Sequence, residues 1–176
     1  MDWVAHISFA LILGFCYSII TKKEVSYSLL SLGSVLPDIF KLHYLLMYFV
    51  GEINAMNFFA PYHTIVGALL VSVAVSQLFD SPFKKTFLTL VAGVSTHFFL
   101  DGLLWPFGKV VYFFWPFYTF YTSFGLVWPD SYIPTIIFGL GAILMYLTYS
   151  FVSIKKYSLK RTYFRKEKTE ERISMR

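Results

Sequence analysis

Apolar side chains fill five stretches of this chain, and short polar turns separate them. The stretches cover residues 4–20, 26–50, 61–79, 84–104 and 132–154. A helix of about 20 apolar residues crosses a bilayer, so each stretch is expected to form one membrane-spanning helix. The pattern predicts an all-α, polytopic helix bundle of about five spans over residues 1–154, followed by a charged tail over 155–176.

The second stretch is interrupted by polar residues and by Pro37. Proline lacks a backbone N–H and disfavours helix at the residue before it, so we expect a kink or break near Leu36. A straight helix would hold Asp38 about 18 Å from Val50, near the middle of the bilayer. A break lets Asp38 lie closer to the surface, and broken backbone at membrane depth is tolerated where it lines a cavity or is buried in protein.

The composition excludes an ordinary soluble domain. Hydrophobic residues make up 57% of the chain and charged residues 14%, whereas soluble domains carry about a quarter charged residues. The first stretch has no basic head and no small-residue cleavage site after it, so a span is expected there rather than a signal peptide. The single cysteine, Cys16, lies within this stretch and is expected to pack as a small hydrophobe.

The basic residues predict an orientation. With five spans, all of the fifteen Lys and Arg residues except Lys41 and Lys109 fall on one side. The positive-inside rule then places the N-terminus outside and the tail in the cytoplasm, in contact with anionic membrane lipids rather than nucleic acid. A sixth span over 109–127 would reverse the tail, so this aromatic segment is predicted to be re-entrant or interfacial.

Ionisable residues recur at a similar depth on several predicted spans. His97 and Asp101 are four residues apart in the fourth stretch, and therefore share one helix face. His6 and His63 lie near the outer ends of the first and third stretches, and a break at Pro37 lets Asp38 join them. Such groups are costly at membrane depth and usually face a bundle interior or a wet cavity. We therefore expect these five side chains to converge.

This set of side chains is typical of a metal site. Imidazole and carboxylate ligands without thiolate suit zinc, manganese or iron, with zinc as the first choice. A divalent metal held there would lower the pKa of a bound water to about 7. Asp38 and Lys41 are the candidate catalytic residues, with Lys41 offsetting negative charge on a substrate. His43 lies about 140° around a helix from Asp38 and is not expected to share its ligand face.

Simpler explanations exist for each residue alone. Asp101 could only accept a hydrogen bond from His97, and Asp38 could only pair with Lys41. Two other functions also remain open: a non-catalytic membrane protein that binds or conducts metal ions or protons, and a structural protein with a degenerate site. Conduction would need polar groups towards the inner side, where the sequence offers little apart from Ser and Thr.

Five short blocks occur in order along the chain: V-A-H at 4–6, G-S-V-L-P-D at 33–38, P-Y-H-T at 61–64, S-T-H-F-F-L-D at 95–101 and F-W-P-F at 114–117. In these blocks the chain resembles the membrane-bound metal-dependent hydrolases related to the LexA-binding inner-membrane hydrolase, over roughly residues 3–120. That family is thought to be distantly similar to zinc-dependent phospholipase C and P1-type nucleases. The resemblance therefore implies a hydrolase acting on a phosphoester or lipid-like substrate at the outer membrane face.

Two departures from the family pattern concern candidate ligands. Family members often carry a second acidic residue shortly after the Pro-Asp pair, where this chain has Phe40. Many also have a His-Arg pair upstream of the His-Thr pair, where this chain has Phe58 and Phe59. These losses favour a single metal ion over a pair of ions.

Overall fold

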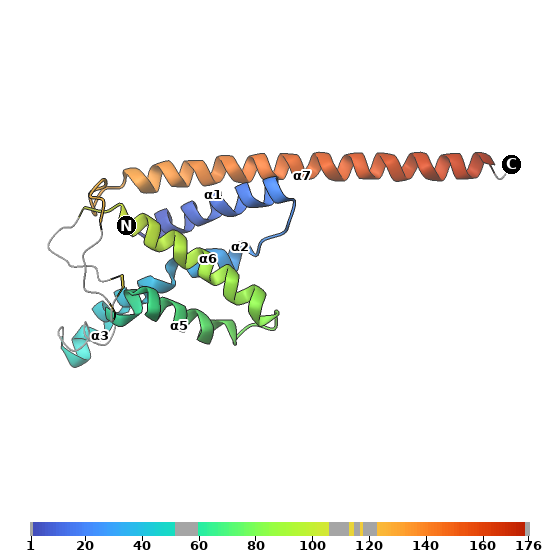
Figure 1. Ribbon diagram of the computed structural model, residues 1–176. Coiled ribbons are helices and arrows are strands. Elements are labelled where there is room, and N and C mark those ends of the chain that lie inside the picture. Colours follow the sequence, from blue (N-terminus) through green and yellow to red (C-terminus); the bar gives the residue numbers. More distant parts are fainter. Residues whose placement is uncertain (1, 52–59, 106–112, 115–116, 118–122, 175–176) are drawn as a thin grey trace.

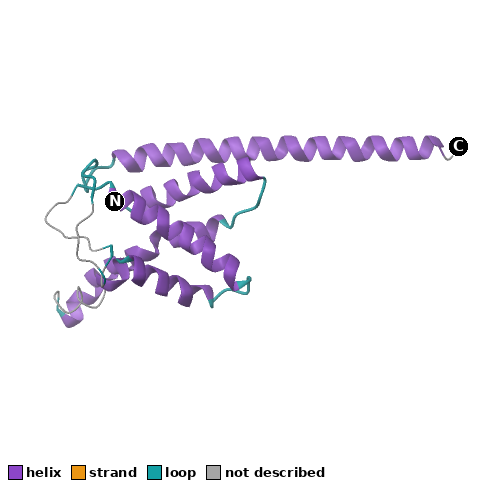
Figure 2. Ribbon diagram, viewed as in Figure 1, coloured by secondary structure: helices purple, strands orange, loops and turns teal. Residues whose placement is uncertain are grey.

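The computed structural model describes residues 2–51, 60–105, 113–114, 117 and 123–174. Within these ranges the fold is all-helical, as predicted, and the only extended pairing is an isolated bridge between Leu104 and Val127. Figure 2 shows the helices and the loops that join them. The elements are α1 (Trp3–Thr21), α2 (Tyr27–Val35), the 3₁₀ helix η1 (Leu36–Leu42), α3 (His43–Val50), the 3₁₀ helix η2 (Ala60–His63), α5 (Ile65–Ser76), α6 (Phe83–Gly102) and α7 (Ile133–Ser174).

The first and last helices run side by side in the same direction (Figure 1). Asp2 caps α1 by accepting a hydrogen bond from the Ala5 N–H at 2.8 Å, and its other carboxylate oxygen accepts one from the Thr135 hydroxyl in α7. Farther along, the ring centroids of Phe9 and Phe138 are 5.2 Å apart. These contacts fix the start of α1, and with it the position of His6.

A close crossing of α2 and α6 forms the centre of the bundle. A Cβ atom added to Gly33 would lie 2.3 Å from the Leu90 carbonyl oxygen, and one added to Gly93 would lie 2.3 Å from the Leu30 carbonyl oxygen. Small residues allow helix backbones in membranes to approach this closely, and here only glycine fits. The crossing therefore brings the end of α2 against α6.

The buried core extends from this crossing towards α5. Its members are apolar side chains of α2, η1, α5 and α6, namely Leu29, Leu36, Ala68, Leu90 and Val94. Helices in a membrane are held together largely by van der Waals contacts of this kind, because lipid tails are as apolar as the side chains themselves.

The predicted break at Pro37 is confirmed. Helix α2 ends at Val35, the chain continues as the 3₁₀ helix η1, and α3 begins at His43. Pro37 is fully buried and Asp38 is 3% exposed, so the broken backbone faces protein. The break turns Asp38 towards α6 instead of leaving it on a continuous helix.

Among the residues that the structure describes, three helical segments are long and apolar enough to cross a membrane: Trp3–Thr21, Tyr27–Val50 and Ile133–Ile154. Helix α5 has only 12 residues, and the 20-residue α6 carries charged residues near both ends. The count of five spans therefore stays a prediction. In Figure 1, α1, α5 and α7 run one way and α2 and α6 run the other, which gathers the lysine-bearing turns at the end where α7 extends. This layout agrees with the predicted orientation, which also stays a prediction.

The charged tail continues the last helix. Helix α7 is 42 residues long and continues without interruption from the apolar segment to Ser174. At 1.5 Å per residue, the part after Ile154 adds about 30 Å of helix. Lys, Arg and Glu have good helix propensity, which was the available signal for this continuation.

The aromatic segment after α6 lies largely outside the described residues, including Lys109, Trp115 and Pro116. Its described part returns to the bundle. The Ile65 N–H donates to the Phe113 carbonyl at 2.9 Å, and the Phe113 ring packs on Phe98 with centroids 5.2 Å apart. This contact lies at the same end of α6 as His97.

Candidate metal centre

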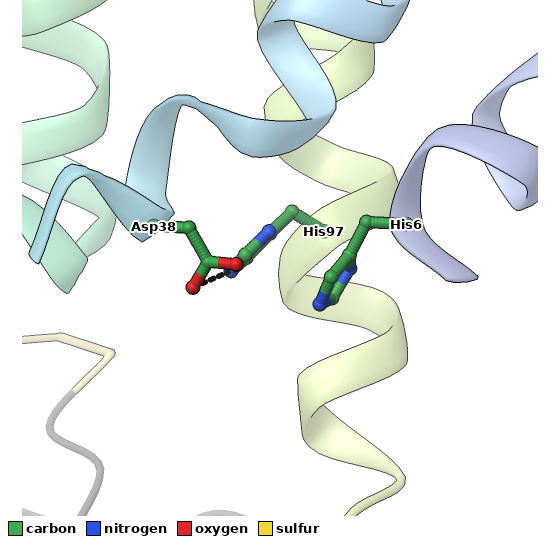
Figure 3. Close-up of side chains that lie close together, drawn as sticks. All are labelled: His6, Asp38 and His97. Atoms are coloured by element: carbon green, nitrogen blue, oxygen red, sulfur yellow. Dashed lines mark ion pairs between the residues drawn. The ribbon is translucent and has the colours of Figure 1, made fainter. Parts of the chain in front are cut away.

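Four elements contribute to one cluster of ionisable side chains. His6 comes from the first turns of α1, Asp38 from η1, His63 from the end of η2, and His97 and Asp101 from α6. His6 and His97 are fully buried, Asp38 is 3% exposed and Asp101 9%, whereas His63 is 17% exposed. The predicted convergence of these residues is therefore confirmed. Figure 3 shows three of them, with His6, Asp38 and His97 side by side.

Asp101 is the common partner of the three histidines. Its Oδ1 lies 3.3 Å from His6 Nε2, and its Oδ2 lies 3.1 Å from His63 Nε2 and 3.2 Å from His97 Nε2. The i, i+4 spacing of His97 and Asp101 gives one of these contacts within α6, and the other two join α1 and η2 to it. A single carboxylate therefore holds three elements together.

The orientation of His97 is set by a backbone carbonyl. His97 Nδ1 lies 2.8 Å from the Ser34 carbonyl oxygen, at the end of α2. A carbonyl oxygen can only accept, so Nδ1 carries the proton and Nε2 of the neutral ring is a lone pair. Histidine ligands of metals are commonly fixed in this way by a hydrogen bond from the second ring nitrogen. The Gly33–Gly93 crossing thus turns Nε2 of His97 towards the cluster.

His97 Nε2 lies close to two other polar atoms of the cluster. Besides Asp101 Oδ2, it lies 3.2 Å from His63 Nε2. Lone pairs turned towards each other at this distance repel, so either a proton on a ring nitrogen or a cation must lie among them. The protonated network is the simpler of the two arrangements, and it corresponds to the hydrogen-bond-only explanation of Asp101.

His6 adds an observation that protonation of the other residues does not explain. Neither of its ring nitrogens has a hydrogen-bond partner among the described residues, although the side chain is fully buried. Its Nε2 is within ion-pair distance of Asp101 Oδ1, but the angles do not form a hydrogen bond. The ring stacks on His97 with centroids 4.0 Å apart and planes at 17°. A buried polar atom without a hydrogen bond costs about 1–3 kcal/mol, so a further partner for either ring nitrogen of His6 would stabilise the site.

Lys41 forms an ion pair with Asp38. This is the pairing that the sequence analysis gave as the simpler, structural explanation of Asp38. Lys41 Nζ lies 2.6 Å from Asp38 Oδ2, while Asp38 Oδ1 lies 4.0 Å from His97 Nε2. One oxygen of the carboxylate therefore holds the lysine and the other faces the cluster. With this arrangement Asp38 could be a metal ligand, a general base, or one half of a purely structural ion pair with Lys41.

The donor set fits one divalent ion. Zinc bonds of about 2.0–2.1 Å in a tetrahedral site place ligand atoms about 3.3–3.4 Å apart. His63, His97 and Asp101 have mutual ligand-atom distances of 3.1–3.2 Å, close to that spacing. The triad of His6, Asp38 and His97 also has its ligand atoms within 4.8 Å of one another. His97 belongs to both triads, so a single ion held there would have up to five candidate ligands.

Local structure explains why His63 is followed by threonine. The Thr64 hydroxyl accepts from the Gly67 N–H at 3.0 Å, which caps α5, and donates to the Pro61 carbonyl at 2.7 Å. These two bonds fix the turn between η2 and α5, and thereby the direction of His63. Phe98 closes the same side, with its ring 5.8 Å from that of His63.

Sequence reasoning missed the Ser34 carbonyl, because a backbone acceptor leaves no side-chain signature. It also missed the stacking of His6 on His97, which depends on the packing of α1 against α6. The side chains of Phe40 and His43 are outside the described set, as is all of Phe58, so the expectations about these residues are not tested.

Comparison with known proteins identifies the family. A sequence profile described as YdjM inner membrane protein matches residues 1–158, which include every residue of the cluster. The chain belongs to the YdjM inner membrane protein family. Membership supports a membrane protein, in agreement with the apolar helices. The searches of curated proteins and of solved structures gave no match. The metal and hydrolase parts of the resemblance stay predictions.

Proposed function

We propose that this YdjM-family protein is a membrane-embedded hydrolase that holds one divalent metal ion, zinc, and cleaves a phosphoester or lipid-like substrate at the outer membrane face. The observation that carries the proposal is the position of Asp101, within 3.1–3.3 Å of three histidine Nε2 atoms that come from three elements. Without an ion, this arrangement brings polar atoms close together and leaves the two ring nitrogens of His6 without a hydrogen bond among the described residues. A divalent ion held there would take ligands from this set of atoms.

The residues divide into ligands and partners of the reaction. His63, His97 and Asp101 would form the core of the ligand set, with His6 or Asp38 completing it. A divalent ion held there supplies Lewis acidity, which lowers the pKa of a water ligand and polarises an ester oxygen. The chain itself orients the ligands through the Ser34 carbonyl and the Thr64 turn.

Asp38 and Lys41 have roles that follow from their pairing. Asp38 Oδ1 faces the cluster and would take the proton of the attacking water as general base. The water oxygen then bonds to the phosphorus or carbonyl carbon while the ester bond breaks and its oxygen leaves. Lys41 holds Asp38 through Oδ2 and places a positive charge beside the site, which would offset the charge of a phosphoryl group. Phe98 and Phe113 give the site an apolar border, which suits an amphipathic substrate.

Turnover by purified, zinc-loaded protein tests the proposal. The substrates would be a chromogenic phosphodiester and a short-chain phospholipid, each assayed with wild-type protein, Asp101→Asn and Asp38→Asn. We expect Asp101→Asn to lose both metal and turnover, because a neutral amide replaces the anionic ligand. Asp38→Asn should lower turnover by about 10²–10⁴-fold, the usual contribution of a general base.

Asp80→Asn is the matched control. Asp80 is exposed in the turn between α5 and α6, away from the cluster, so the same change of charge should leave metal content and turnover unchanged. Full metal content in Asp101→Asn would reject the ligand set. Full metal content in wild-type protein without turnover of any ester would reject the hydrolase and leave a metal-binding membrane protein.

A further inference from the structure

A cavity lies on the side of α6 opposite the cluster of His and Asp side chains, between α6, the second half of α1 and the start of α2. Its volume is about 590 Å³, within the range of about 300–1,000 Å³ typical of small-molecule sites. Apolar side chains dominate its lining, among them Leu13, Leu30 and Leu88. None of the five residues of the metal cluster lines it, so this cavity is a separate feature of the fold.

The three hydroxyl groups that α6 contributes to the wall are hydrogen-bonded within the helix. Thr89 donates to the Lys85 carbonyl at 2.8 Å, Ser95 to the Val91 carbonyl at 2.9 Å, and Thr96 to the Gly93 carbonyl at 2.7 Å. All three bonds run back along α6, so these residues present mainly carbon to the cavity. The wall along α6 therefore suits a hydrocarbon chain.

The length of the cavity matches one leaflet. Its lining along α6 begins at Lys85 and continues to Ser95 and Thr96. Ten helical residues correspond to about 15 Å, half of the roughly 30 Å hydrocarbon core of a bilayer. A groove of this length accommodates the acyl region of a lipid from a single leaflet, the one next to the lysine-bearing turns.

Two charged side chains of opposite sign line this groove at its polar end. Lys85 lies in the first turn of α6, and Glu24 lies in the turn between α1 and α2. Neither forms an ion pair within 4.0 Å with any residue that the structure describes, so both charges are available to a ligand. A headgroup that carries a phosphate and a primary ammonium complements one cation and one anion.

We propose that this groove binds a phospholipid with a phosphoethanolamine headgroup. Its acyl chain lies along Leu13, Leu30 and Leu88, its phosphate contacts Lys85, and its ammonium contacts Glu24. An anionic lipid such as phosphatidylglycerol would gain the contact with Lys85 but would meet Glu24 as a like charge. The groove is thus a structural lipid site, independent of the proposed hydrolytic centre.

Native mass spectrometry of the full chain tests this proposal, with phosphatidylethanolamine, phosphatidylglycerol and phosphatidylcholine titrated in turn. We expect phosphatidylethanolamine to bind about two- to fivefold more tightly than phosphatidylglycerol, the effect of one partly exposed charge contact. Glu24→Gln should remove this preference. Lys85→Gln should weaken the binding of phosphatidylethanolamine by about two- to fivefold. The neighbouring Lys84 does not line the groove, so Lys84→Gln should leave this binding unchanged.

A change in the wall gives a second readout. Ala92 lines the groove and is exposed, so the larger side chain in Ala92→Phe would fill the groove without entering the buried core. This substitution should weaken the binding of all three lipids to the same extent. Equal or tighter binding of phosphatidylglycerol by wild-type protein would overturn the headgroup assignment. Equal losses in Lys84→Gln and Lys85→Gln, or unchanged binding in Ala92→Phe, would overturn the groove as the site.

Discussion

Gly93→Ala should disturb the cluster of His and Asp side chains from a distance, because Gly93 sets the separation of α2 and α6. The new Cβ would lie 2.3 Å from the Leu30 carbonyl oxygen and 2.7 Å from the Ser34 nitrogen, whereas ordinary contacts begin near 3.4 Å. The helices must therefore separate by roughly 1 Å. A shift of that size would stretch the 2.8 Å hydrogen bond from His97 Nδ1 to the Ser34 carbonyl beyond hydrogen-bond range.

Two losses follow from this displacement. Overpacking of this kind costs about 1–3 kcal/mol of stability. Loss of the hydrogen bond that orients a ligand histidine lowers metal affinity by about 10–100-fold. Thermal unfolding in detergent would report the first loss, and competition with a zinc chelator would report the second.

Gly139→Ala is the matched control, since a Cβ at Gly139 in α7 meets nothing within 4 Å. It should leave zinc affinity unchanged and should not destabilise the protein, because alanine is the better helix former. Wild-type stability and wild-type zinc affinity in Gly93→Ala would refute the role of the glycine crossing.

Three further predictions concern other elements. Thr64→Ala should cost about 1 kcal/mol in thermal unfolding because it removes the cap of α5, and Thr64→Ser should restore that stability. Lys41→Gln should lower kcat/KM for an anionic phosphodiester more than for a neutral ester, because it removes the charge beside Asp38; equal losses would rule out a role in substrate charge. In a background whose native cysteine has been replaced, Asp130→Cys should react with an impermeant thiol reagent added to intact cells and Ser174→Cys should not, because the tail is predicted to be cytoplasmic; labelling of Ser174→Cys would reverse the orientation.

The helices and the break were predictable because their signals are local. Apolar stretches long enough to cross a membrane predict helices, and Pro37 by itself interrupts one of them. The convergence of His6, His63 and Asp101 was predictable from another local argument, since ionisable groups at membrane depth avoid lipid. These residues had to face inward, and the alternating direction of the helices placed them at one depth.

The geometry inside the cluster was not predictable, because it depends on contacts between distant residues. His97 and the Ser34 carbonyl are 63 positions apart and meet only through the crossing of Gly33 and Gly93. Hydrophobic periodicity carries no information about which glycines face each other. The stacking of His6 on His97 has the same origin in helix packing.

The continuation of α7 to Ser174 was not among the sequence-based predictions. Apolar character ends near Ile154, and the sequence was divided there into span and tail. A helix does not need apolar residues, however, and the Lys-, Arg- and Glu-rich sequence after 154 favours helix by propensity alone. The end of an apolar segment therefore need not be the end of the helix.

X-ray absorption at the zinc edge, combined with metal analysis of the purified chain, tests the central claim most directly. The account predicts one zinc ion per chain in a shell of nitrogen and oxygen at about 2.0–2.2 Å, without sulfur. Asp101→Asn should lose this signal, and Asp80→Asn should keep it. A gently purified wild-type chain without bound metal, or a zinc shell containing sulfur at about 2.3 Å, would contradict the assignment of the His and Asp cluster as a metal centre.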